Sequence, residues 1–73
     1  MWINFYMDDL DIHCEAKIFQ HPSQWGINNS RISKLNVWTP QNNDYQLTYE
    51  YDRGSINGSL DDDMINKIID YVK

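Results

Sequence analysis

Three cationic side chains lie in two short segments of an otherwise acidic chain. Arg31 and Lys34 are three residues apart in WGINNSRISKLNVW (residues 25–38), and Arg53 lies in YDRGS (residues 51–55). Guanidinium and ammonium groups bind phosphates and carboxylates, and a tryptophan ring stacks on a base or a cation. With Trp25 and Trp38, these cations are therefore a candidate site for an anion or a phosphate-bearing nucleotide.

A second interpretation of the cations needs no ligand. If the strands that contain Arg31 and Arg53 are antiparallel neighbours, residue 31 lies near residues 52–53. Arg31 would then pair with Asp52 or Glu50 across the sheet. We favour this internal pairing, and the sequence leaves both interpretations open.

The acidic residues form a second candidate site, of opposite charge. The chain has 11 acidic and 6 basic residues and a net charge of −5, which argues against binding of nucleic acid or anionic membrane. An acidic surface does suit a basic protein partner. The candidate contact residues lie in a predicted turn and at a predicted helix start: Asp8, Asp9, Asp11, Asp61, Asp62 and Asp63.

Residues for catalysis or metal binding are sparse. His13 and Cys14 are adjacent on a predicted strand, so their side chains point to opposite faces and cannot easily share an ion with His21. Ser23 follows His21 by two residues, but no Gly-x-Ser-x-Gly turn is present. We therefore predict no metal, no cofactor and no enzymatic activity.

Alternating apolar residues predict four strands, at residues 2–7, 11–19, 31–39 and 45–52. In the second strand Ile12, Cys14 and Ala16 share one face, whereas the inward face of the third strand is ambiguous. Residues 20–30 and PQNND (residues 40–44) read as connections, and RGSINGS (residues 53–59) reads as a turn-rich segment.

The C-terminal segment SLDDDMINKIIDYVK predicts a helix. Ser59 fits the N-cap and Asp62 fits the third helical position of a capping box. An apolar stripe at helical spacing would face the core. Its members are Leu60, Met64, Ile65, Ile68, Ile69 and Val72.

These elements predict a single α+β domain over residues 1–73, a four-stranded antiparallel meander with the C-terminal helix packed on one face. The other face would carry several large rings, which favours a partner or a C2 homodimer. No signal sequence or transmembrane run is recognisable. With one cysteine, Cys14, the chain fits the cytoplasm of a bacterial host.

Two segments resemble the pattern of an uncharacterised family of small bacterial and phage domains. The pattern is aromatic-Gly-Ile-Asn-x-x-Arg-Ile-Ser-Lys-Leu, followed by Tyr-Asp-Arg-Gly, and it matches residues 25–35 and 51–54. This chain has Asn29 and Ser30 where we expect two glycines, and Ser55 where we expect tryptophan. The resemblance implies a short protein of a mobile element, a context in which inhibitors of host defence are common.

We therefore predict a small acidic phage or mobile-element interaction protein. In this hypothesis it inhibits a bacterial defence system such as CRISPR by occluding a basic surface of a defence protein. The two alternatives are a small-ligand binder that sequesters a phosphate-bearing signal and a structural or housekeeping phage protein.

Overall fold

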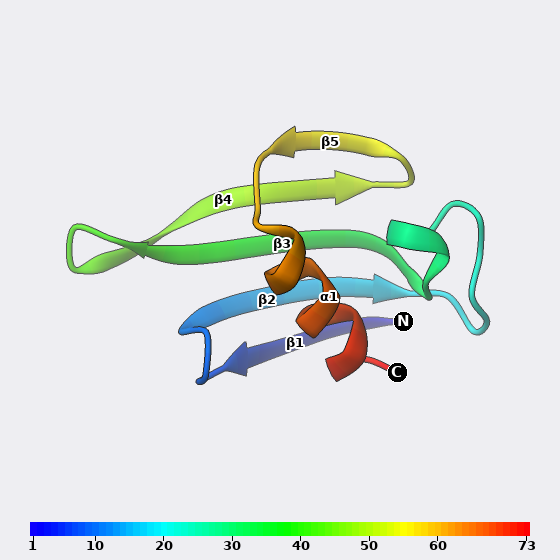
Figure 1. The fold of residues 1–73 in the computed structure, drawn as a ribbon, viewed down its shortest axis with the longest axis horizontal. Helices are drawn as coiled ribbons and strands as arrows, with labels where there is room; N and C mark the ends of the chain where they lie inside the picture. The colour runs from blue at the N-terminus through cyan, green and yellow to red at the C-terminus, as the bar shows by residue number, and fades with distance from the viewer.

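A five-stranded antiparallel sheet with one helix on one face makes up the protein in the computed structural model, which describes residues 1–73 (Figure 1). The strands follow one another in the order β1-β2-β3-β4-β5, so every neighbouring pair is joined by a hairpin or a loop. The elements are β1 (Trp2–Met7), β2 (Ile12–Ile18), a helical turn (Ile27–Asn29), β3 (Ile32–Gln41), β4 (Asp44–Asp52), β5 (Ser55–Gly58) and α1 (Asp62–Tyr71). The α+β class and the meander are confirmed.

The predicted strand number was wrong by one, because SING forms the short strand β5. Its pairing begins at Ser55, opposite Asp52, after a two-residue turn of Arg53 and Gly54. Both turn residues have positive φ, 47° and 104°, as tight hairpin turns require. All four residues of β5 are exposed, so their sequence carries no apolar alternation that would reveal a strand.

The predicted connection PQNND is largely strand. β3 continues to Gln41, β4 begins at Asp44, and only Asn42 and Asn43 form the turn, with φ of 52° and 64°. Asparagine tolerates this left-handed backbone better than most residues. The turn end of β3 and β4 extends beyond the other strands as a two-stranded arm (Figure 1).

The inner face of the sheet carries the core. Ile12, Cys14 and Ala16 of β2 are buried, as predicted, and Cys14 pairs with Val37 and Ala16 with Leu35 of β3. The inward face of β3 is therefore the one that holds Leu35 and Val37. Ile32 is buried as well, because the β2–β3 register shifts between Lys17 and Ile18. The complete buried apolar set is Met7, Ile12, Cys14, Ala16, Ile27, Ile32, Leu35, Val37, Tyr49, Tyr51, Ile65 and Ile68.

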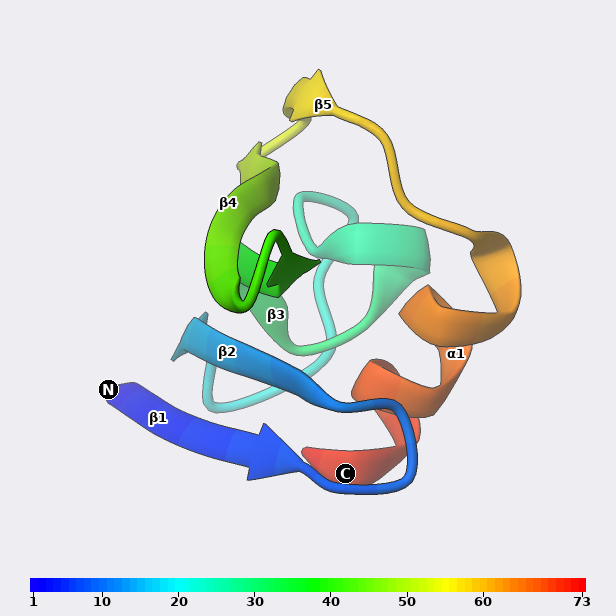
Figure 2. The ribbon, with the colours of Figure 1, turned by 90° about the vertical axis from the view of Figure 1, so that its left-hand side faces the viewer.

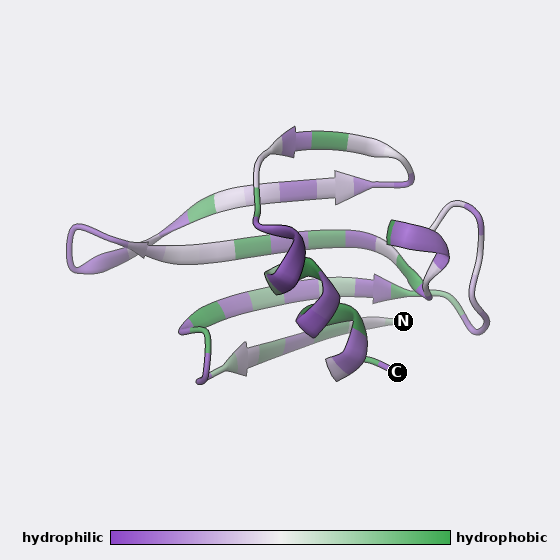
Figure 3. Ribbon diagram, in the orientation of Figure 1, coloured by the Kyte–Doolittle hydropathy of each residue, from purple (hydrophilic) through white to green (hydrophobic).

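The helix α1 crosses this inner face and presents its polar side outward (Figures 2 and 3). Ile65 and Ile68 are buried, and the rest of the predicted stripe is partly buried. The N-cap is Asp61 rather than Ser59, since the Asp61 carboxylate accepts a 2.7 Å hydrogen bond from the Asp63 N–H. At 10 residues the helix is neither long nor apolar enough to cross a membrane.

Replacing Ile68 with aspartate should abolish the cooperative unfolding transition. Ile68 is fully buried between helix and sheet, and an unpaired carboxylate there costs several kcal/mol against a total stability on the order of 5 kcal/mol. Thermal unfolding followed by circular dichroism provides the measurement. Asn66→Asp adds the same charge at an exposed helix position and should leave the melt nearly unchanged. Equal melts for the two variants would contradict this account of the core.

Candidate interaction surface

Arg31 closes the long loop between β2 and β3. Its Nε donates a 3.0 Å hydrogen bond to the Phe19 carbonyl, and the Phe19 N–H donates to the Arg31 carbonyl at 2.6 Å. The loop of residues 20–30 is thus held at both of its ends. No ion pair joins Arg31 to Asp52 or Glu50, so the predicted internal pairing is wrong in its partner.

Other residues of segment 25–35 also have structural roles within the fold. A Cβ on Gly26 would lie 2.0 Å from the Ser30 carbonyl oxygen, so only glycine fits there. Ile27 is buried, and Asn28 and Asn29 adopt positive φ of 50° and 61°. The loop therefore folds back on itself, and its small and amide residues are explained without a ligand.

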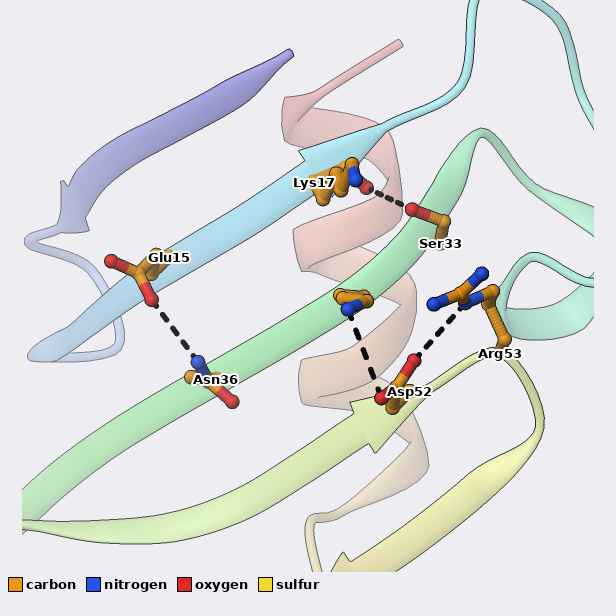
Figure 4. Close-up of polar contacts among 7 residues, drawn as sticks. Glu15, Lys17, Ser33, Asn36, Asp52 and Arg53 are labelled. Carbon is orange, nitrogen blue, oxygen red and sulfur yellow. Dashed lines mark hydrogen bonds and ion pairs between the residues drawn. The ribbon is translucent and has the colours of Figure 1, made fainter.

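Lys34 and Arg53 do come together, on Asp52. Lys34 lies opposite Asp52 in the register of β3 and β4, with Nζ 3.9 Å from the carboxylate, and Arg53 Nε lies 3.3 Å from its other oxygen (Figure 4). Arg31 instead lines a hollow beside the C-terminal end of α1, with Asn28, Asn29 and Lys73 among its neighbours. The three predicted ligand-binding cations therefore form no single cluster, and two of them share the carboxylate of Asp52.

The open face is the sheet face that α1 leaves uncovered. Across β2, β3 and β4 it carries polar pairs: Asn36 donates to Glu15 at 3.1 Å, and Lys34 lies between Lys17 and Asp52 in the strand registers (Figure 4). Exposed pairs of this type contribute about 1 kcal/mol or less each. The middle of the open face is therefore polar and close to electrically balanced.

A cluster of rings forms at the turn end of the open face. The Asp11 carboxylate accepts hydrogen bonds from the hydroxyls of Tyr6 at 2.8 Å and Tyr45 at 2.5 Å. The His13 ring lies between these two tyrosines, with centroids 4.7 Å and 4.5 Å away. This phenol cluster (Tyr6, Asp11, His13 and Tyr45) joins the β1–β2 turn to the arm of β3 and β4.

Hydrogen bonding shifts the acidities within the phenol cluster. The Tyr45 and Tyr6 hydroxyls stabilise the charged carboxylate and lower the pKa of Asp11. In return, the bond to Asp11 raises the pKa of Tyr45 to about 12 and also raises that of Tyr6. Sequence reasoning missed this cluster, because Tyr45 reaches Asp11 from 34 positions away only through the register of the arm.

The two candidate tryptophans occupy different surroundings. Trp38 lies on the open face, in a hollow shared with Asn4, His13 and Glu15. Trp25 is 58% exposed in the long loop, and its carbonyl accepts a 3.0 Å hydrogen bond from the Tyr51 hydroxyl. Neither ring lies in a hollow that also contains Arg31, Lys34 or Arg53.

Five of the six predicted acidic residues lie at or beside the two ends of α1. Asp8 and Asp9 border a hollow at the C-terminal end of α1, together with Lys67 and Asp70. Asp61, Asp62 and Asp63 lie at the other end of the same helix, about 15 Å away by helical rise. We call these carboxylates the acidic band, which consists of Asp8, Asp9, Asp61, Asp62, Asp63 and Asp70. Asp11 belongs to the phenol cluster instead.

Chemically reactive groups are few in this structure. Burial raises the pKa of the Cys14 thiol to about 12, which leaves it protonated and a poor nucleophile at neutral pH. No group of three or more histidine, cysteine or acidic side chains has a metal-binding arrangement. What the exposed groups offer is charge and ring surface for contact with a partner.

Comparison with protein families assigns almost the whole chain to a family. Residues 1–72 match a family model described as a domain of unknown function, DUF7678. No curated protein and no solved structure matches the chain.

Removing the Asp11 carboxylate should shift the tyrosine titration. In Asp11→Asn, Tyr45 should ionise closer to pH 10 than to its pKa of about 12, because the charged acceptor is lost. Ultraviolet absorbance of phenolate against pH measures this change. Asp9→Asn removes one charge from the same turn without a phenol partner, and it should leave the titration of Tyr45 unchanged.

Asp11 should also make stability depend on pH in a defined window. Its pKa is lower in the folded state than its usual 3.8, so its contribution is present above that value and is lost as pH falls further. The pKa of Tyr45 is raised, so its contribution is present below pH 10 and is lost as pH rises toward about 12. The melting temperatures of wild type and Asp11→Asn should therefore differ most between these limits. A difference in melting temperature that keeps its full size outside this window would contradict the assignment.

Arg31→Ala should lower stability by about 1–3 kcal/mol, because it removes a partly buried charged donor from the Phe19 carbonyl. Arg53→Ala is the matched control: its guanidinium is 61% exposed and its ion pair should contribute about 1 kcal/mol or less. Chemical denaturation measures both values. A larger effect of Arg53→Ala would contradict the structural role of Arg31.

Proposed function

Because this chain belongs to the DUF7678 family, whose function is unknown, we propose its function from its own surface: it is an interaction protein that covers a basic surface of a partner protein with its acidic band. The specific role that we propose is inhibition, by occlusion, of a bacterial defence system such as CRISPR. The setting would be the cytoplasm of a bacterial host that carries a phage or mobile element.

The distribution of charge carries this proposal. The acidic band has six carboxylates at the ends of α1 and in the neighbouring turn, whereas the cations there are Lys67 on the helix and Lys73 just after it. Lys73 is itself paired with Asp70 at 3.1 Å. The open face, in contrast, balances Glu15, Glu50 and Asp52 against lysines and an arginine. Most of the uncompensated negative charge therefore lies on the helix side, where it favours approach to a basic surface.

The spacing of the acidic band suits a channel or groove that binds a nucleic acid backbone. Its two ends lie about 15 Å apart along α1. Duplex DNA carries one negative charge per about 1.7 Å of helix axis. A channel that binds a few base pairs therefore presents cations over a length comparable with the distance between the two ends of the acidic band. Because α1 is already an ordered helix, binding would not need to order the backbone that carries its carboxylates.

The alternative of a phosphate-bearing ligand has less support. It relied on Arg31, Lys34 and Arg53 acting together, and Arg31 is bonded to a carbonyl while the other two flank Asp52. A ligand would have to displace these contacts before it gained any charge interaction. We therefore retain the acidic band as the basis of function.

Relief of host defence tests the proposal directly. Bacteria that carry a defence system would be infected with a restricted phage, with and without this protein, and plaque formation would be counted. Wild-type protein should restore plaques against at least one system. The double variant Asp9→Asn with Asp63→Asn should restore fewer, because exposed charge pairs are worth up to about 1 kcal/mol each and affinity should fall between about 3- and 30-fold.

A matched control separates the acidic band from net charge. Glu15→Gln with Glu50→Gln changes the net charge by the same amount but lies on the open face, so it should act like wild type. In purified form, binding of the protein to a defence effector should weaken as salt rises, since the Debye length shortens from about 10 Å at 0.1 M to about 3 Å at 1 M. Equal losses in both double variants, or no relief of any defence system, would contradict the proposed function.

A further inference from the structure

β1 is an edge strand that lacks the usual protection against pairing. The sheet order places β1 and β5 at the two edges. β5 has only four residues and ends at Gly58, whereas β1 is WINFYM, with no charged residue, no proline and no register shift against β2. Edges that stay unpaired usually carry charges, prolines or bulges, because a bare edge pairs readily with another strand.

The backbone of β1 has free hydrogen-bonding groups on its outer side. The Ile18 N–H donates to the Met1 carbonyl at 2.8 Å, so Met1 faces β2. The bonding direction alternates along an antiparallel strand. Trp2, Asn4 and Tyr6 therefore direct their N–H and C=O groups away from the sheet.

We infer that a second copy of this chain pairs antiparallel with β1 about a two-fold axis at Asn4, which extends the sheet from five strands to ten. In this register Asn4 faces Asn4 of the second copy, and Trp2 faces its Tyr6. The same outward groups meet on both strands, so every one of them gains a partner. The inference does not depend on the proposed function, because it involves none of the acidic band.

Side chains on both faces of β1 match this pairing. Trp2 and Tyr6 are 48% and 45% exposed on the open face, and the register places each beside the other ring of the second copy. On the helix side, half-buried Ile3 would lie beside Phe5 of the second copy. Phe5 already stacks on Tyr71 at 4.4 Å, and the Tyr71 ring is 55% exposed at the end of α1. Aromatic and aliphatic cross-strand pairs of this type stabilise sheets.

Electrostatics favour this contact for two copies of an acidic chain. A net charge of −5 opposes self-association unless the contact is uncharged. The first charges after β1 are Asp8 and Asp9. In the two-fold register the two copies of Asp8 lie eight residues apart along the paired strands, or roughly 27 Å, well beyond a Debye length of about 8 Å. Their repulsion is therefore largely screened at physiological salt.

A charge exchange at the two-fold axis tests the pairing. Wild type should sediment as a dimer at high micromolar concentration in analytical ultracentrifugation. Asn4→Lys and Asn4→Asp each place like charges opposite one another and should weaken the dimer at least about tenfold. An equimolar mixture of the two variants should restore dimers, because lysine then faces aspartate. Asn4→Ser is the neutral control and should behave like wild type.

Two further measurements keep the outcome decisive. Melting of each variant at low concentration should show a folded monomer, since Asn4 is exposed. Asn4 lies opposite Glu15 in β2, so Asn4→Asp could unfold through repulsion between two carboxylates. In that case amide hydrogen exchange of the wild type is the test instead: the Asn4 and Tyr6 amides should become protected as protein concentration rises. A monomer at every concentration would overturn the inference. The inference would also be overturned if Asn4→Lys and Asn4→Asp both dimerised as strongly as wild type. Pairing of β1 only with a strand of another protein would overturn it as well.

Discussion

One ten-residue helix must cover the inner face of a five-stranded sheet, and the rest of the structure follows from that constraint. Ile65 and Ile68 bury the centre of this face, and Leu35 and Val37 lie fully buried in the strand beneath. Each buried aliphatic side chain contributes about 1.5–3 kcal/mol. Residues 1–73 contain no second α-helix, and the opposite face of the sheet is open in this structure. The edge β1 and the arm of β3 and β4 stay open as well.

The uncovered parts are stabilised by local contacts instead of by a second core layer. Asp11 ties the arm to the β1–β2 turn through Tyr6 and Tyr45, and Asp52 joins Lys34 to Arg53 at the opposite end. These contacts are exposed, and each is weak on its own. They nevertheless fix where rings and charges lie on the surface. The open face is consequently balanced in charge, while the helix side carries the acidic band.

The segment that first suggested ligand binding turns out to organise the longest loop. Gly26 permits a close backbone approach to Ser30, and Arg31 bonds the carbonyl of Phe19 where the loop begins. A cationic side chain at the border of a loop and a strand can bind a ligand, or it can donate a hydrogen bond to a main-chain carbonyl. Only the position of its nearest acceptor separates them. Here that acceptor is a main-chain carbonyl, which is indistinguishable in sequence from any other.

The sequence by itself determined the α+β class, the meander, the apolar stripe of the helix and the inward set of β2, because periodicity of 2 or 3.6 residues is a local property. It could not reveal β5, whose exposed residues have no apolar pattern, or the N-cap at Asp61, since Ser59 and Asp61 are both good caps. Only the tertiary structure decided which face of β3 is buried. It also decided that Tyr45 donates a hydrogen bond to Asp11, and that Arg31 lies apart from Lys34 and Arg53. Each of these depends on strand register, and register is set by contacts between residues far apart in the chain, which no local pattern records.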